Sequence, residues 1–353
     1  MIRIFFTHIL PKDKILKYKL SVAACNFSWN LIEGGMFDQF YSIMPTYIQT
    51  KMEDVHMPEL VYSPLRTKGR ILSKIAILHE NYKIFKLLPK ECSVWLYNIS
   101  SLNLLLFFLL RWFRKSTKVN VIILDYTPAK DWLSQLCLWA YNHCDGTITL
   151  AQSPLFTVKN TLCLPGVTSN DIDNVPKQLQ INRNFLISGV LNERIAMLTM
   201  LLEAFSKIPE LTLHITGFLN DESIFEKYKA SKNIIYHGKL SYDDYLNVLH
   251  HCSFLLSTRN PEYEENQCNF PSKIMEALLH NRIVVSTIHY GQLKDVNYLE
   301  VSSNIKQFIK ELQNIMSYSQ NELMEFANQG AKVQILFSPK IWNDTMTKIE
   351  NRE

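Results

Sequence analysis

The sequence lacks the cysteine patterns that hold disulfide-bonded or zinc-binding domains together. Its seven cysteines are scattered, with no Cys-x-x-Cys pair and no Cys/His cluster at zinc-ligand spacing. An odd, dispersed set of this kind is typical of reduced thiols. We therefore expect a cytoplasmic protein.

Long apolar runs are also absent. The most apolar segment, residues 102–110, is interrupted by Asn103 and ended by Arg111, far short of the roughly 20 residues of a membrane-spanning helix. The N-terminus enters a strand-like segment at once, without the basic region and apolar core of a secretory signal. Both absences favour a cytoplasmic location.

The chain carries no strong charge of either sign. Its formal net charge is +4, whereas duplex-binding proteins usually show a concentrated basic face, so we expect no nucleic-acid partner. What the chain does have is 47% hydrophobic and 20% charged residues over a length of 353. This balance predicts two globular domains of ordinary size.

Strand-like and helix-like segments alternate through the first half, which predicts an α/β domain with a mainly parallel sheet. The expected strands cover residues 3–9, 94–99, 118–124 and 146–151. Helical patterns cover residues 36–43, 102–113 and 131–143. The polar segment 168–182 then reads as a linker.

The second half alternates again and predicts a second α/β domain. Its expected strands are 184–188, 212–216, 234–237, 254–257 and 283–287. Its expected helices are 195–206, 223–230, 242–249, 273–279, 305–316 and 322–334. Three strands end at Gly189, Gly217 and Gly238, and ligands of open α/β sheets lie beyond the carboxyl ends of strands.

The most informative stretch is residues 269–279. Pro271 precedes Ser272, a residue suited to the start of a helix, and the free amides there attract phosphate. Lys273 adds a full positive charge. Glu276 follows one turn deeper on the face of Ser272, where it can accept hydrogen bonds from a diol. Phosphate-binding groups followed by an acceptor for ribose hydroxyls match the order of the diphosphate and ribose in a nucleoside diphosphate.

Residues 183–290 resemble the nucleotide-sugar-binding domain of the family 4 (group 1) retaining glycosyltransferases. The resemblance lies in Ser188–Leu191 with Arg194, Leu213–Gly217, Ile235–Gly238 and Phe270–Lys273 with Glu276. It implies the GT-B fold of two facing Rossmann-like domains. We expect a first, acceptor-side domain at 1–170, a donor domain at 171–336, and a closing helix at 337–353 that packs back on the first domain.

The resemblance implies roles for individual residues. Ser272, Lys273 and Arg194 would hold the diphosphate, and Glu276 the ribose, while Gly189, Phe270, Gly217, Gly238 and Lys239 would line the donor site. For Arg194 a surface salt bridge is an equal alternative, and glycines at strand ends are also ordinary turn residues. Lys273 and Glu276 retain the simpler alternative of solvated or ion-paired side chains.

In the first domain the resemblance is weaker. Gly34 and Gly35 match the loop that approaches the phosphates, against the alternative of a plain turn. Asp125, beyond the strand at 118–124, would orient or deprotonate an acceptor hydroxyl, against the alternative of a helix cap. The helix at 102–113, with its basic end, packs in the core or contacts the inner face of a membrane that carries a lipid-linked acceptor.

The expected reaction moves a hexosyl group from a nucleoside-diphosphate sugar to a glycan or lipid-linked acceptor, with retention, without a metal and with no other cofactor. The spacing Asp-x-Asp of metal-dependent sugar transferases occurs only at Asp171–Asp173, in the linker. The sequence departs from the family pattern at two positions, because Val190 replaces an arginine and Cys268 replaces a glutamate. Two alternative functions therefore stay open. One is a catalytically silent sugar-nucleotide-binding subunit, and the other is a nucleotide-sugar epimerase, although no paired carboxylates for an epimerase stand out.

Overall fold

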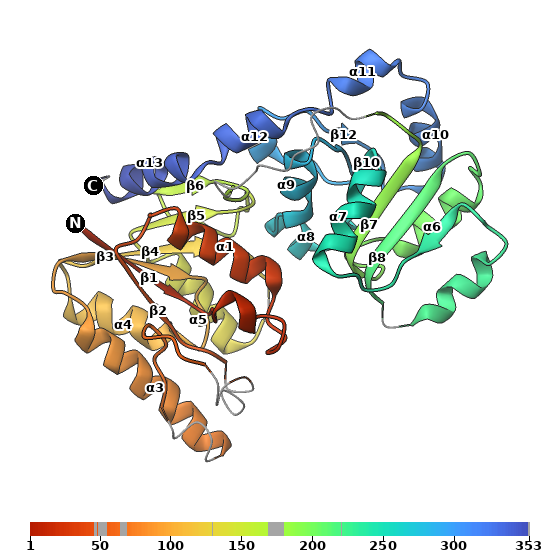
Figure 1. Cartoon of the computed structure of the whole chain (residues 1–353). Helices are drawn as coiled ribbons and strands as arrows, with labels where there is room; N and C mark the ends of the chain where they lie inside the picture. The colour runs from red at the N-terminus through yellow and green to blue at the C-terminus, as the bar shows by residue number, and fades with distance from the viewer. Residues whose placement is uncertain are drawn as a thin grey trace. The chain divides into compact units, whose positions relative to one another are not determined.

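The computed structural model describes residues 1–45, 48, 55–63, 69–128, 130–168, 180–219 and 221–351 (Figure 1). Most of the expected linker, including the Asp171–Asp173 pair, lies outside these residues. The chain divides into two compact units. Unit 1 comprises residues 1–170 and 337–353, and unit 2 comprises residues 171–336.

Unit 1 is built on a six-stranded parallel sheet with the order β2-β1-β3-β4-β5-β6. Its strands are β1 Ile2–Thr7, β2 Gln39–Ser42, β3 Cys92–Tyr97, β4 Lys118–Ile123, β5 Gly146–Thr149 and β6 Thr161–Cys163. The central strands are buried along nearly their whole length, as their β-branched and aromatic residues require. Its helices are α1 Val22–Glu33, α3 Arg70–Leu87, α4 Leu104–Phe113, α5 Trp132–Tyr141 and α13 Pro339–Glu350.

Unit 2 repeats this architecture with the strand order β12-β11-β10-β7-β8-β9, again all parallel. The strands are β7 Asn184–Leu191, β8 Thr212–Leu219, β9 Ile234–Tyr236, β10 Phe254–Ser257, β11 Ile283–Ser286 and β12 Leu299–Glu300. The α-helices are α6 Leu198–Ser206, α7 Tyr242–His251, α8 Glu264–Cys268, α9 Ser272–Leu279, α10 Ile305–Ile315, α11 Gln320–Met324 and α12 Gly330–Leu336. The predicted α/β class with mainly parallel sheets is confirmed.

Three predicted helices are wrong in type or extent. Residues 36–43 were expected to be helical, but 39–42 form the edge strand β2, because pairing with β1 overrides a pattern that fits both periods. The helix expected at 322–334 is two helices, interrupted at Asn328, whose left-handed φ of 52° cannot continue a helix. Residues 222–228 form a short 3₁₀ helix within the segment expected to be an α-helix at 223–230.

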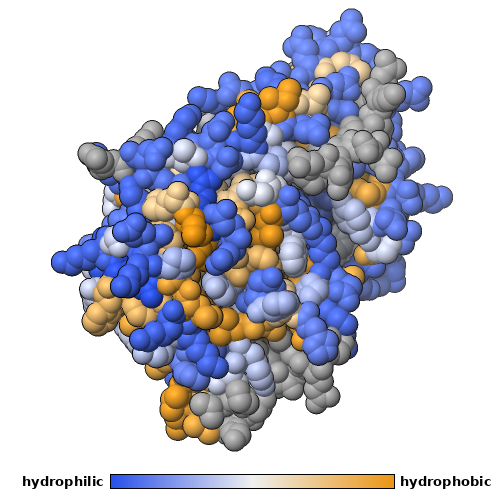
Figure 2. All heavy atoms as spheres, turned by 60° about the vertical axis from the view of Figure 1, so that its left-hand side comes forward, coloured by the Kyte–Doolittle hydropathy of each residue, from blue (hydrophilic) through white to orange (hydrophobic). Residues whose placement is uncertain are grey.

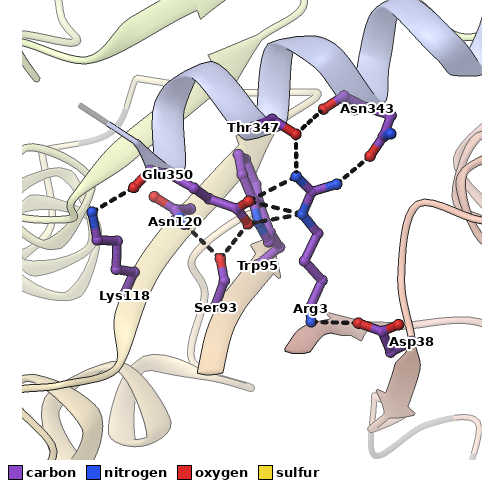
Figure 3. A network of polar contacts seen from close by, with 9 residues as sticks. All are labelled: Arg3, Asp38, Ser93, Trp95, Lys118, Asn120, Asn343, Thr347 and Glu350. Atoms are coloured by element: carbon purple, nitrogen blue, oxygen red, sulfur yellow. Dashed lines mark hydrogen bonds and ion pairs between the residues drawn. The ribbon is translucent and has the colours of Figure 1, made fainter. Parts of the chain in front are cut away.

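Helix α13 is bound to the sheet of unit 1 through the carboxylate of Glu350 (Figure 3). Arg3 on β1 bonds both carboxylate oxygens through Nε, at 3.0 and 2.8 Å. Two residues of β3 also donate to Oε1, Ser93 through its hydroxyl at 2.5 Å and Trp95 through Nε1 at 2.9 Å. Glu350 is only 7% exposed, so this buried charge is compensated by several donors at once.

Candidate donor site

The segment 269–276 lies in unit 2 as a short loop followed by α9. Pro271 precedes the helix, and Ser272 is its first residue, with no side-chain capping hydrogen bond. The apolar residues Ile274 and Ala277 face the core and are fully buried. Helical spacing therefore leaves Ser272, Lys273 and Glu276 on the accessible side of the first turns.

Lys273 and Glu276 form a compact cluster with Tyr245 of α7. Lys273 Nζ lies 2.7 Å from Glu276 Oε2, and the Tyr245 hydroxyl donates to the same oxygen at 2.8 Å. The ammonium also lies 3.8 Å from the centroid of the Tyr245 ring, a cation–π arrangement. The side chain of Lys273 is 37% exposed and that of Glu276 is 20% exposed. The cluster thus presents an oriented cation and a carboxylate to solvent.

Two tyrosines of α7 stay protonated beside this carboxylate. Burial raises the pKa of Tyr245 well above its ordinary value, and the nearby Glu276 charge raises it further. Burial, and then Glu276, also raise the pKa of Tyr242 to about 12. Both hydroxyls are therefore hydrogen-bond donors at neutral pH. No sequence motif marked these residues, because α7 meets α9 only in the folded chain.

Gly189 and Gly217 lie opposite each other in β7 and β8 and have positive φ angles of 118° and 132°. A Cβ atom on Gly217 would stand 2.0 Å from the carbonyl oxygen of Gly189. The close approach of the two strand backbones therefore requires glycine at position 217. Gly238 follows β9 with a φ of 69°, and Lys239 next to it is exposed.

Arg194 follows β7 and forms an ion pair with Glu265 of α8. Its guanidinium also lies 5.0 Å from the centroid of the Tyr263 ring. The side chain is 49% exposed, whereas that of Glu265 is 12% exposed. This is the surface salt bridge that was the alternative to a phosphate contact, so Arg194 would have to exchange Glu265 for a phosphate.

Arg259 is a cation that the sequence motifs did not single out. It lies two residues beyond the end of β10 and is half-buried. One of its guanidinium nitrogens lies 3.5 Å from the amide oxygen of Asn266. Its backbone carbonyl accepts a hydrogen bond of 2.6 Å from Thr287, beyond the end of β11. No carboxylate of the described residues forms an ion pair with it. The rule that ligands lie beyond strand ends is the one sequence signal that could have found this position.

Phe270 and Cys268 support the loop from within. Phe270 is 4% exposed, and its ring packs edge-on against Tyr290 with centroids 5.1 Å apart. Cys268 is buried to the same extent. Asn281 ends α9 in the left-handed conformation expected for it, with a φ of 60°. These residues position the loop and are not presented to solvent at the site.

The candidate residues of unit 1 lie at opposite ends of its strands. Asp125 is exposed just beyond the carboxyl end of β4. Burial, and then the charge of Asp125, raise the pKa of Tyr97 at the end of β3. Gly34 and Gly35 instead end α1 ahead of β2, at the edge where the strands begin. Gly35 has a φ of 70°, typical of a helix-ending turn. The two glycines therefore match the turn alternative and stay outside the proposed donor site.

Within the part of the chain that the structure describes, no group of three or more His, Cys, Asp or Glu side chains is arranged to hold a metal ion.

Sequence comparison gives no match, since no protein-family model and no curated protein is similar to the chain. Solved structures do resemble it. A point mutant of S. aureus TarM, solved in complex with fondaparinux, alpha-GlcNAc-glycerol and UDP, has a TM-score of 0.57 at 17% identity, covering 79% of this chain. The chain spans 59% of the length of that TarM chain.

Two further structures match over essentially their whole length. Anabaena Alr3699/HepE, in complex with UDP and glucose, has a TM-score of 0.64 at 15% identity, with 99% of each chain covered. The trehalose-6-phosphate synthase OtsA has a TM-score of 0.64 at 10% identity, with 100% of each chain covered. At these identities the likeness establishes the fold, which is GT-B.

Proposed function

We propose that this GT-B protein is a glycosyltransferase that takes a hexosyl group from a nucleoside-diphosphate sugar and transfers it to a glycan or lipid-linked acceptor. The observation that carries the proposal is the Lys273–Glu276–Tyr245 cluster on the first turns of α9. TarM and HepE were both solved with UDP, which supports a nucleotide-sugar donor.

The diphosphate is assigned to the start of α9. Amides of the first helical turn point outward without intrahelical acceptors, and the helix dipole favours negative charge there. Lys273 brings its ammonium to the same turn, held in place by Glu276 and the Tyr245 ring. Arg259 adds a second cation at the end of β10. Charge that develops on the departing phosphate is stabilised by such preorganised donors.

The ribose is assigned to Glu276. Lys273 and Tyr245 both bond the same oxygen, Oε2. A carboxylate has about four lone-pair sites in all, so Oε1 is the oxygen that we assign to the ribose hydroxyls. The protonated tyrosines beside it keep the carboxylate oriented.

The cations of unit 2 would neutralise the diphosphate in a transfer that needs no metal and retains the anomeric configuration. The departing nucleoside diphosphate would draw its stabilisation from Lys273 and the α9 amides, while the sugar takes on oxocarbenium character. Unit 1 would supply the acceptor side, with Asp125 as the candidate group that orients or deprotonates an acceptor hydroxyl. Fondaparinux in the TarM structure and glucose in the HepE structure support a glycan as the acceptor.

A panel of nucleotide sugars tests this function. The chain is incubated with each donor and with glycan and lipid-linked acceptors, and the release of nucleoside diphosphate is followed. Release that requires both a donor and an acceptor, and that Lys273→Ala removes, is the expected result. Lys306→Ala is the matched control, because Lys306 is an exposed lysine on α10.

A catalytically silent donor-binding subunit is the second candidate. It is favoured by the two departures from the family pattern that the sequence resembles, namely Val190, 49% exposed, in place of an arginine and the buried Cys268 in place of a glutamate. Donor binding without release of nucleoside diphosphate for any donor and acceptor would favour this candidate over the enzyme.

A further inference from the structure

Helix α3 of unit 1 exposes an apolar face to solvent and turns polar residues inward. Four aliphatic and aromatic side chains, spaced at helical intervals along one face, are exposed: Ile71 at 77%, Ile75 at 47%, Leu78 at 50% and Tyr82 at 47%. Up to Asn81, the face turned inward instead buries small and polar residues, namely Ser73, Ala76, Glu80 and Asn81, and only the last turn buries an aliphatic residue, Ile84. Over most of its length α3 therefore reverses an ordinary surface helix, which turns its apolar stripe to the core.

The orientation of α3 is set by hydrogen bonds to its neighbours. The Asn81 amide donates to the carbonyls of Ile77 at 2.7 Å and Leu102 at 2.8 Å, and its oxygen accepts from the Leu106 backbone at 3.0 Å. Turning the helix over would break the bonds to Leu102 and Leu106, which costs free energy because the Leu106 amide and the Asn81 side chain would lose these partners. The exposed stripe is therefore a property of the fold.

Aromatic side chains of α4 and α5 give unit 1 further exposed apolar area. Trp112 and Phe113, at the end of α4, are 64% and 70% exposed, and Trp132, at the start of α5, is 75% exposed. The half-buried Phe108 ring contacts both Trp112, at 4.9 Å between centroids, and Trp139, at 5.8 Å. Figure 2 shows orange, apolar side chains gathered low on the face where α3 and α4 lie in Figure 1. We call these residues with the α3 stripe the α3–α5 face.

The charges along the α3 and α4 part of this face are mainly positive, whereas the exposed Asp131 adjoins Trp132 of α5. By helical spacing Lys74 lies on one side of the α3 stripe and Lys86 on the other, with its ammonium 5.4 Å from the centroid of the Tyr82 ring. Residues 71–117 contain two acidic side chains, and Glu80 is buried, which leaves Glu91 as the exposed one. Exposed lysines of the same segment are Lys74, Lys83, Lys86, Lys90 and Lys115.

We propose that the α3–α5 face docks on an anionic lipid surface. An apolar stripe flanked by lysines is the pattern of a helix that lies in a membrane interface, where lysines reach the headgroups and exposed tryptophans settle at the boundary. Protein–protein interfaces are depleted of lysine, so this composition fits lipid better than a protein partner. None of the described helices is long and apolar enough to cross a membrane, and the docking proposed here is peripheral.

Flotation with vesicles tests the proposal directly. The full chain is mixed with vesicles of phosphatidylcholine alone or of phosphatidylcholine with phosphatidylglycerol, at low and high salt. We expect flotation with the anionic vesicles that weakens as salt rises, because salt screens the attraction between the surface lysines and the anionic headgroups. The measurement uses no nucleotide, so its result is independent of the proposed transfer reaction.

A matched pair of variants locates the contact. Ile71→Asp should lower partitioning about tenfold, since it removes apolar contact and adds a charge of the wrong sign. Ile335→Asp on α12 is the control, because Ile335 is 70% exposed in unit 2, close to the 77% of Ile71. Lys83→Glu with Lys86→Glu should reduce binding to anionic vesicles at least as strongly, and far-UV circular dichroism verifies that each variant folds.

Three results would overturn the proposal. The first is a wild-type chain that stays unbound to anionic vesicles at low salt. The second is equal loss of binding in Ile71→Asp and Ile335→Asp. If sedimentation shows instead a dimer that only Ile71→Asp dissociates, the face is an interface between copies of the chain and the lipid assignment is wrong.

Discussion

Two glutamates of this chain each hold a cation and an aromatic side chain, yet their surroundings give them different roles. Glu350 of unit 1 is 7% exposed, and Arg3, Ser93 and Trp95 donate to its carboxylate. Glu276 of unit 2 has a side chain 20% exposed and receives Lys273 and Tyr245 on one oxygen. Burial and the number of donors, and not residue type, separate a structural charge from one that is available to a ligand.

The largest effect is expected at the structural glutamate. Glu350→Ala leaves the Arg3 guanidinium buried without its counter-ion, which typically costs 3–5 kcal/mol, roughly the cost we expect here. All six tryptophans belong to unit 1, so denaturant unfolding followed by tryptophan fluorescence reports that unit. Nucleoside-diphosphate binding by unit 2 should be unchanged. A fluorescence midpoint equal to that of the parent would contradict the structural role.

A buried group without a counter-ion should make unit 2 sensitive to acid. His214 of β8 is 6% exposed, and burial together with His237 and His251 lowers its pKa to about 4. The unfolded state, with an ordinary histidine pKa near 6.5, then binds more protons between pH 6.5 and 4. The free energy of unfolding therefore falls as pH drops through this window, by up to about 3 kcal/mol.

His214→Leu tests this assignment. The variant removes the titrating ring, so the loss of unit 2 stability between pH 6.5 and 4 should shrink, as measured by far-UV circular dichroism, with tryptophan fluorescence following unit 1 in parallel. If the stability of unit 2 falls equally with pH in parent and variant, a group other than His214 causes the acid sensitivity.

The next largest effect is expected for Lys273, the cation assigned to the diphosphate. Lys273→Ala should weaken binding of a nucleoside diphosphate by about 2 kcal/mol, roughly thirtyfold, because a charge-assisted contact to phosphate is lost. Stability should change by less than about 1 kcal/mol, since the ion pair with Glu276 is partly exposed. Calorimetric titration measures the affinity, with Lys306→Ala as the control. An unchanged affinity in Lys273→Ala would remove the phosphate assignment.

The smallest effect is expected for Glu276→Gln, which distinguishes ribose recognition from phosphate recognition. Glu276→Gln should lower nucleoside-diphosphate affinity about tenfold, about 1.4 kcal/mol, while leaving inorganic pyrophosphate binding nearly unchanged, because pyrophosphate carries no ribose. Lys273→Ala should weaken both ligands. Parallel losses for the two ligands in Glu276→Gln would mean that this carboxylate acts only through Lys273.

Sequence reasoning recovered most strands of both sheets, because parallel strands buried on both faces read as short β-branched runs bounded by turns. It located α9 and its Lys273–Glu276 pair from a local pattern. It missed Tyr245 and Arg259, whose place at the site depends on packing between elements far apart in sequence. It also missed α3, because a helix that exposes Ile75 and buries Asn81 reverses the usual pattern.

The central claim is that the start of α9 binds the diphosphate of a nucleotide sugar, and a crystal structure of the chain with a bound nucleoside diphosphate tests it most directly. The account predicts phosphate oxygens within hydrogen-bond distance of Lys273 Nζ and of the α9 amides, with the ribose hydroxyls on Glu276. A nucleotide bound elsewhere, with the Lys273–Glu276 pair intact and untouched by ligand, would contradict it.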